Sequence, residues 1–288
     1  MYDLFRRWWL GHEDRIAIDI QDSRVVIVSQ RAGARRVSST KVVELSCGRT
    51  PRVGGGDALA LVEETRGSLP DIDCHYSRLA VVLSPSDTLC ARLSGVPRSA
   101  ILHGGRARAF VEERLSLSPE EYRVRVIPQE GADGEIECEV IATRRSTVEG
   151  WLEAARRLGA ELVAMVPRPY ALMPALRALD CGQGCGTSLV VDLTDSAASL
   201  YVYVNGEVAR TTILGGLSSG VFRDSLSEAV LKVMSELGDG AVGIGVLGQA
   251  REPMHAALDE SFWKRLANGR LTWTVGSDIP ARGILEAV

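Results

Sequence analysis

The sequence predicts an α/β protein built from two similar lobes, each with a β-sheet core. Two segments, Ala17–Ser23 (AIDIQDS) and Val190–Ser196 (VVDLTDS), share the pattern hydrophobic-hydrophobic-Asp-hydrophobic-x-Asp-Ser and lie 192 − 19 = 173 residues apart. Each segment opens a run of three short strands rich in apolar residues. A helical pattern and a further apolar strand follow in both halves. The chain therefore repeats a β-β-β-α-β unit.

The first unit occupies the start of the chain. Strands are expected at Arg15–Gln21, Arg24–Arg31 and Arg35–Leu45, which are rich in Val, Ile, Ser and Thr and are joined by short turns. Asp57 can then cap a short helix. The run RLAVVLS at Arg78–Ser84 is apolar at successive positions, which is typical of a strand covered on both faces.

A segment with a different order follows, at residues 86–166. The pattern predicts strand, helix, two strands, helix and strand at Leu89–Val96, Ser99–Leu115, Tyr122–Pro128, Glu135–Thr143, Thr147–Leu158 and Glu161–Val166. The β-α-β-β-α-β order fits a compact module of about 80 residues. We therefore expect an inserted subdomain that interrupts the first lobe.

The second unit begins after a Gly- and Cys-rich stretch. Its hairpin is expected at Thr187–Leu193 and Ala198–Val204, followed by a strand at Glu207–Leu214, a helix at Val221–Leu237 and the strand VGIGVLG. The predicted domains are a discontinuous first lobe at 1–85 with 167–186, the insert at 86–166 and the second lobe at 187–288.

Composition excludes several classes of protein. The chain has 288 residues with 33 basic and 37 acidic side chains, so it lacks the basic footprint of a nucleic-acid binder. No apolar run approaches the roughly 20 residues that span a bilayer, and Arg6 and Arg7 interrupt any secretory signal. The six cysteines form no CxxC pair, which favours reduced thiols and a cytoplasmic location.

The duplicated unit with an Asp-bearing hairpin resembles the actin-like ATPase fold. The insert resembles the small subdomain of the bacterial branch that contains FtsA and the type IV pilus assembly protein PilM. Similarity to the PilM family extends over essentially the whole chain. It is carried by the order and spacing of LFRR before RIAIDI, SGVPRSAI, LSLSPEEYRVRV, VEGWLEAARRLGAELVAMVPRPYAL and YVYVNGEVARTTILGG.

This resemblance implies a nucleotide cleft between the two hairpins. Asp19 and Asp192 match the family acids that order magnesium, although acids at strand ends also cap turns. Gly215-Gly216 matches the pair before the second-lobe helix, and Gly248 lies in the expected adenine-side turn. The full set of expected cofactor-binding residues is Asp19, Gln21, Asp22, Ser23, Asp192, Thr194, Asp195, Gly215, Gly216 and Gly248.

The phosphate turns depart from the family pattern. Gln21 and Thr194 replace the glycines that let backbone N–H groups approach phosphate, and Asp22 and Asp195 follow them. A carboxylate about 4 Å from a phosphate oxygen repels it by about 4 kcal/mol at an effective dielectric of 20. We therefore expect ATP and Mg²⁺ to bind weakly or not at all, as in a degenerate actin-like ATPase. The simpler interpretation of Asp22 and Asp195 is an Asx-type hairpin turn.

The resemblance implies a scaffold that is cytoplasmic and peripheral to the inner membrane, in a type IV pilus or a related secretion or competence machine. Its partner would be the cytoplasmic N-terminal tail of an inner-membrane PilN-like or GspL/GspM-like protein. In the family this tail lies between the first lobe and the insert. The candidate lining residues, which could equally be core, are Leu79, Phe110, Val111, Leu115, Trp151 and Leu152.

Two alternative functions remain open from the sequence. One is an active actin-fold ATPase or small-molecule kinase, which would need intact phosphate turns and an acid to deprotonate a substrate hydroxyl. The other is a filament-forming protein. The opening YDLFRRWWL, with aromatic residues beside paired arginines, suits either docking to a partner or packing on the first lobe.

Overall fold

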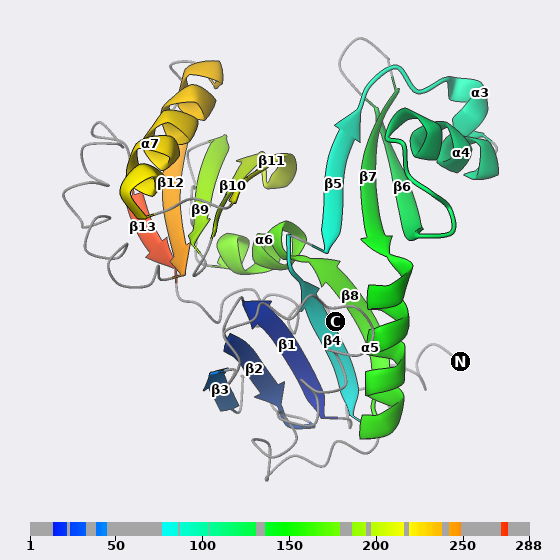
Figure 1. Cartoon of the computed structure of the whole chain (residues 1–288), viewed down its shortest axis with the longest axis vertical. Coiled ribbons are helices and arrows are strands. Elements are labelled where there is room, and N and C mark those ends of the chain that lie inside the picture. The colour runs from blue at the N-terminus through cyan, green and yellow to red at the C-terminus, as the bar shows by residue number, and fades with distance from the viewer. Residues whose placement is uncertain are drawn as a thin grey trace.

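The computed structural model describes residues 14–21, 24–32, 39–44, 77–85, 87–102, 104–130, 136–178, 186–193, 197–215, 219–237, 242–248 and 272–275. Two lobes and an inserted subdomain make up the chain (Figure 1). The N-terminal YDLFRRWWL and the Asp57 helix lie outside the described residues.

The first lobe contains a five-stranded sheet with the order β3-β2-β1-β4-β8. Strands β1 (Arg15–Gln21), β2 (Arg24–Gln30) and β3 (Ser39–Glu44) form the expected antiparallel meander. Strand β4 (Arg78–Leu83) runs parallel to β1, and β8 (Glu161–Pro167) runs parallel to β4. Strand β4 is buried along nearly its whole length, as parallel strands covered on both faces usually are, which explains its continuous apolar run.

Within the described residues, one helix packs on each face of this sheet. Helix α5 (Arg145–Leu158) packs Trp151, Ala154 and Leu158 against the apolar side chains of β1 and β4, and it ends at Gly159 with a φ of 75°. Helix α6 (Arg168–Ala178) packs Ala171 on the opposite face. The first-lobe core is therefore completed by segments far along the chain.

The insert is smaller than predicted. Strand β5 (Thr88–Leu93) lies in a separate antiparallel sheet of order β5-β7-β6, with β6 at Tyr122–Glu130 and β7 at Ile136–Arg144, whereas β8 lies in the first-lobe sheet. The expected β-α-β-β-α-β module is corrected accordingly: α5 and β8 belong to the first lobe. The physical reason is that the first-lobe sheet needs the apolar stripe of α5 to cover one face.

The expected helix over Ser99–Leu115 is divided in two. Helix α3 (Arg98–Ile101) is a short turn after Pro97, and α4 (Gly104–Arg114) begins at the glycine pair. Glycine inside a helix costs about 1 kcal/mol relative to alanine, so the pair fits a helix start better than an interior. Val111 of α4 is fully buried within the insert.

The second lobe repeats the order of the first, β11-β10-β9-β12-β13. Strands β9 (Thr187–Leu193), β10 (Ala197–Val204) and β11 (Glu207–Gly215) form its meander, with positive φ at Asn205 and Gly206 in the tight turn. Helix α7 (Ser219–Glu236) covers the sheet, and β12 (Val242–Gly248) and β13 (Thr272–Val275) extend it in parallel. The predicted duplication is confirmed.

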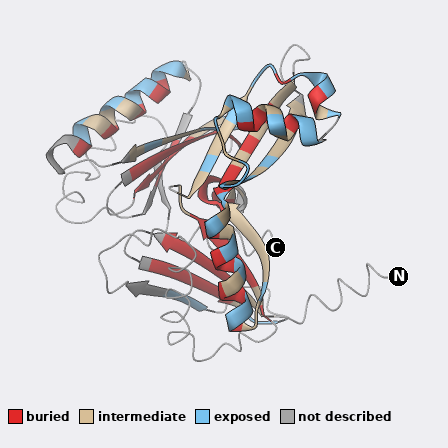
Figure 2. Cartoon of the chain, turned by 45° about the vertical axis from the view of Figure 1, so that its right-hand side comes forward, coloured by how far each residue is buried: buried red, intermediate tan, exposed pale blue. Residues whose placement is uncertain are grey.

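Buried residues concentrate in the central strands of both lobes and on one side of α5 and α7 (Figure 2). Helix α6 lies between the lobes (Figure 1). Among the helices of the described ranges, none combines the length and apolarity needed to cross a membrane.

Candidate functional site between the lobes

The two acids of the repeated pattern are both buried on central strands. Asp19 lies near the end of β1 and Asp192 near the end of β9, and each side chain is 0% exposed. A buried carboxylate requires a positive partner or several hydrogen bonds. Both acids share one such partner.

Arg168, the first residue of α6, connects the two lobes. Its Nη1 donates to Oδ1 of Asp19 at 2.5 Å. Its Nη2 donates to Oδ1 of Asp192 at 3.1 Å, and its Nε donates to Oδ2 of the same carboxylate. This is a bidentate pair on one lobe and a single ion pair on the other, with the Arg168 side chain only 2% exposed. We call Arg168, Asp19 and Asp192 the buried triad.

The electrostatics of the triad favour a charged guanidinium. Burial alone would lower the pKa of Arg168, but Asp19 and Asp192 outweigh it and raise the pKa well above the usual range. Tyr201 of β10 donates its hydroxyl to Oδ2 of Asp192 at 3.2 Å. Burial, followed by Asp192, raises the pKa of Tyr201, so it remains a neutral donor.

These acids do not fit the magnesium site that the resemblance implied. Magnesium demands near-octahedral oxygen coordination at about 2.0–2.1 Å and usually keeps several waters. Three carboxylate oxygens of Asp19 and Asp192 instead accept hydrogen bonds from Arg168, so a magnesium ion would have to displace the guanidinium in order to bind them. No group of three or more metal-ligating side chains occurs in the part of the chain that the structure describes.

The other expected nucleotide residues are only partly described. Gln21 pairs with Arg24 at the end of the first hairpin, and Gly215 pairs with Ala197 at the end of β11. Gly248 ends β12 beside Leu193, which follows Asp192. Asp22, Ser23, Thr194, Asp195 and Gly216 lie outside the described residues.

Sequence reasoning missed Arg168, although a signal was available. Arg168 stands between Pro167 and Pro169 and is the only charged residue from Leu162 to Leu176. A lone charge within an apolar segment that becomes buried must find an opposite charge. The two acids of the repeated pattern were the available partners.

Three of the residues expected to line the partner groove are buried in the core. Leu79, Val111 and Trp151 are fully buried, and Trp151 belongs to the first-lobe core with Leu79. These three side chains therefore stabilise the fold and offer no surface to a peptide. Leu152 is 52% exposed on α5, whereas Phe110 and Leu115 are half-buried at α4.

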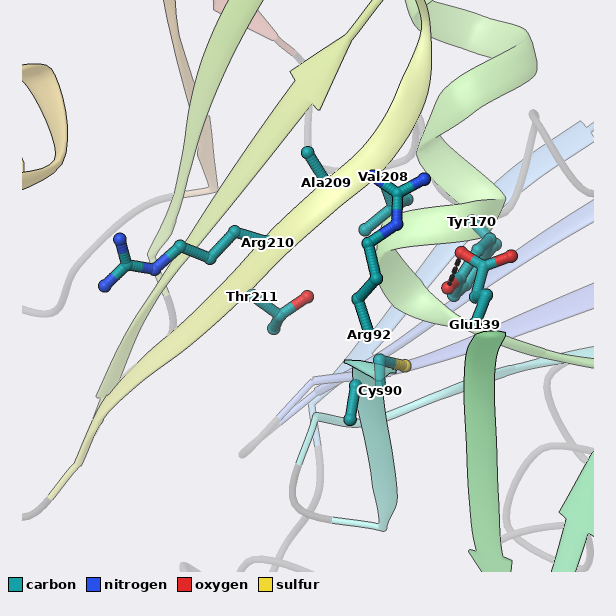
Figure 3. Close-up of a pocket in the computed structure, with 9 residues that line it drawn as sticks. Cys90, Arg92, Glu139, Tyr170, Val208, Ala209, Arg210 and Thr211 are labelled. Carbon is teal, nitrogen blue, oxygen red and sulfur yellow. Dashed lines mark hydrogen bonds between the residues drawn. The ribbon is translucent and has the colours of Figure 1, made fainter. Parts of the chain in front are cut away.

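A pocket of about 230 Å³ opens instead between the insert and the second lobe (Figure 3). Tyr170 of α6 donates its hydroxyl to Glu139 of β7 at one side. Arg210 of β11 points away from Arg92 of β5, and each arginine pairs with a glutamate, Glu236 and Glu137 respectively. The pocket is lined by Cys90, Ala91, Arg92, Glu139, Tyr170, Val208, Ala209, Arg210 and Thr211.

The chemistry of this pocket does not suit nucleophilic catalysis. Burial and the neighbouring Glu139 raise the pKa of the Cys90 thiol to about 12. The thiolate is the reactive form of cysteine, so a protonated thiol is inert near neutral pH. The pocket therefore provides a cavity and hydrogen-bonding groups for a ligand. One of these groups is the buried Thr211 hydroxyl, which has no partner among the described residues.

Comparison with solved structures decides the fold. The chain superposes on a protein of the PilM–PilN type IV pilus biogenesis complex with a TM-score of 0.67 and 16% identity, over 93% of this chain and 89% of that one. The chain has the actin-like ATPase fold. A Bacteroides thetaiotaomicron protein with this fold and the cytoplasmic domain of EpsL, an inner-membrane component of the type II secretion system of Vibrio cholerae, both match with a TM-score of 0.59 and 10% identity.

Both of these matches extend over nearly the full length of each chain. They cover 96% of this chain and 97% of the Bacteroides protein, and 95% of this chain and 95% of the EpsL domain. No family model matches the chain, and no curated protein matches it by sequence. The predicted actin-like two-lobed architecture is thus confirmed, and identities of 10–16% establish the fold alone.

Proposed function

We propose that this actin-like chain is a cytoplasmic scaffold of a type IV pilus or related secretion machine. In this role it binds the cytoplasmic N-terminal tail of an inner-membrane partner of the PilN or GspL/GspM kind, with weak or lost nucleotide binding. The observation that carries the proposal is Arg168, buried between Asp19 and Asp192 in a fold similar to a protein of the PilM–PilN complex.

The buried triad favours a scaffold over an ATPase or kinase. Phosphoryl transfer depends on metal ions that bridge phosphate oxygens and on a residue that orients or deprotonates the nucleophile. Asp19 and Asp192 accept hydrogen bonds from Arg168, so their carboxylates are occupied by a protein cation. Binding of a partner places no such demand on them.

The pocket between the insert and the second lobe supports peptide binding. Strand β5 lies at one edge of the insert sheet, and β11 lies at one edge of the second-lobe sheet. Extended peptides commonly add to exposed sheet edges through main-chain hydrogen bonds. We therefore place the partner tail beside β5 and β11, in the pocket that Cys90 and Thr211 line.

Peptide binding tests the scaffold role. A labelled peptide copied from the cytoplasmic N-terminus of the membrane protein encoded beside this chain should bind at micromolar strength, about −8 kcal/mol, by fluorescence anisotropy. Thr211→Trp, which projects a larger side chain from β11 into the pocket, should weaken binding at least tenfold. Leu231→Trp on the exposed face of α7 is the matched control. Equal binding by both variants would remove the pocket from the site, and absence of binding to the wild-type chain would contradict the scaffold role.

Calorimetry tests nucleotide binding separately. Titration of Mg²⁺–ATP into the chain should give a Kd no tighter than about 1 mM, or about −4 kcal/mol. A micromolar Kd would contradict the loss of nucleotide binding and would favour the ATPase alternative. The peptide measurement stands independently of this outcome.

A further inference from the structure

Helix α6 is held by both lobes at once. Ala171 packs into the first-lobe core, whereas the next residue, Leu172, packs with Val190, Tyr201 and other buried residues of the second lobe. The side chain of Arg168 likewise contacts both lobes, because it forms an ion pair with one acid from each lobe. The start of α6 therefore contacts the cores of both lobes.

We infer that Arg168 is an internal cation that takes the position of a metal ion between the lobes and holds them in one arrangement without bound nucleotide. The inference deepens the proposed loss of nucleotide binding, but it does not depend on the pilus or secretion role. With Arg168 in this position, the two lobes keep the same arrangement at all times, and no nucleotide has to bind or leave.

An arginine is chemically suited to replace a metal here. Its guanidinium remains charged at all relevant pH values, presents five N–H donors in a planar fork, and is more weakly hydrated than an ammonium. In this chain one edge of the fork engages both oxygens of Asp192 and another N–H reaches Asp19. A metal would satisfy the same acids, but it could dissociate when chelated or when nucleotide leaves.

The acids also depend on the cation. Removing one partner of a buried ion pair leaves an uncompensated charge in a low-dielectric interior, which is strongly destabilising. If Arg168 is deleted, Asp19 and Asp192 face each other across the resulting space with no positive charge from Arg168. Such a space should accept a small cation from solution, which gives the inference a gain-of-binding test.

Chemical rescue of Arg168→Ala is that test. We expect its Tm to fall by about 5–15 °C, by the cost of unpaired buried charge. Guanidinium chloride at about 10 mM, far below denaturing concentrations, should recover at least half of the loss. Mg²⁺ or Mn²⁺ at millimolar concentration should also raise the Tm of this variant, while leaving the wild-type Tm unchanged.

Two controls separate rescue from general effects. Sodium chloride at equal ionic strength accounts for screening. Arg156→Ala removes an exposed arginine that pairs with Glu153 and should show a small Tm change and no rescue by guanidinium. Failure of every cation to raise the Tm of Arg168→Ala, or a wild-type Tm that rises with Mg²⁺, would overturn the inference.

A second variant covers the case in which Arg168→Ala does not fold. Arg168→Lys keeps the charge but loses the fork, so its Tm should fall by about half as much as predicted for Arg168→Ala, with no response to Mg²⁺. Small-angle scattering should then give the wild-type chain the same radius of gyration with and without Mg²⁺–ATP. A lysine variant as stable as wild type, or a nucleotide-dependent change in the wild-type radius, would overturn the inference, and the peptide-binding measurement would be unaffected.

Discussion

Tyr203 of β10 donates a hydrogen bond from its hydroxyl to the backbone carbonyl of Pro169, with an oxygen–oxygen distance of 2.8 Å. Burial, and then the charge of Asp192, raise the pKa of Tyr203 well above its ordinary value, so the hydroxyl stays protonated. The bond joins the second lobe to the first turn of α6, one residue from Arg168. It therefore supports the position of the guanidinium without contacting it.

Tyr203→Phe should destabilise the chain by about 1–2 kcal/mol, because the Pro169 carbonyl loses its donor in a buried environment. The free energy of unfolding in urea measures the change. Tyr122→Phe at a half-buried position of β6 is the matched control and should stay within about 0.5 kcal/mol of wild type. Equal losses in the two variants would show that the Tyr203 hydroxyl bond is not a specific support of α6.

The two acids of the triad should show strong coupling. Asp19→Asn or Asp192→Asn alone leaves Arg168 with one counter-charge, so each should cost about 1–3 kcal/mol, more for the bidentate Asp192. The double variant leaves the guanidinium buried with neither carboxylate, and its cost should exceed the sum of the singles by at least about 1 kcal/mol.

A double-mutant cycle measured by urea unfolding gives this coupling. Replacing Arg168 by Met in the double variant removes the stranded charge and should recover stability relative to the double variant. Additive single costs, or a triple variant less stable than the double, would contradict a triad held together by charge.

Asp87, in the turn between β4 and β5, should make stability depend on pH. Burial raises its pKa to about 6, and Arg144 offsets only part of the shift. A carboxyl whose pKa is raised on folding contributes stability that is present below its unfolded value, near 4, and is lost as pH rises through about 6. Asp87→Asn should therefore gain about 1–2 kcal/mol on wild type at pH 7.5, allowing for partial exposure, and nothing at pH 3.5.

Urea unfolding at these two pH values measures the difference. Glu120→Gln, at an exposed position before β6, is the matched control. A stability gain for Asp87→Asn that is the same at both pH values would mean that titration of Asp87 is not its cause.

The sequence predicted most strands and the duplication, because alternating and continuous apolar runs directly report burial. Strand β9 begins and ends where it was expected, and the paired acids Asp19 and Asp192 do lie between the lobes. The local pattern could not predict which sheet contains β8, because an apolar strand fits the first-lobe sheet and the insert sheet equally well. Trp151 was ambiguous for a related reason: helical spacing shows that a side chain is buried but not which core receives it.

Arg168 was missed because its role depends on a contact made across 149 residues with Asp19. Local propensity does not predict that an arginine after a proline is buried or forms an ion pair. Only the combination of a lone charge in an apolar segment with two acids on central strands indicates a buried ion pair. The buried ion pair also changes the functional interpretation. The sequence attributed weak nucleotide binding to altered phosphate turns, whereas the structure adds that the acids of the cleft are paired with Arg168.

Thr88 and Thr143 are paired across β5 and β7, so the two ends of the insert lie side by side. Opposite residues of an antiparallel ladder have Cα atoms only about 4.5–5.5 Å apart, which a short glycine- and serine-rich turn can span. We therefore propose that residues 88–143 can be replaced by about four such residues while the two lobes still fold.

Deletion of residues 86–166 should instead abolish cooperative folding. That deletion removes β8 and α5, and with them Trp151, Ala154 and Leu158 of the first-lobe core. Loss of a buried tryptophan side chain alone costs about 3–5 kcal/mol, against a total stability of about 5–15 kcal/mol for a typical domain. Thermal unfolding followed by circular dichroism should give a single cooperative transition for the 88–143 replacement and none for the 86–166 deletion. If both deletions unfold cooperatively, α5 and β8 are dispensable to the first lobe; if neither does, the insert is part of the same folding unit.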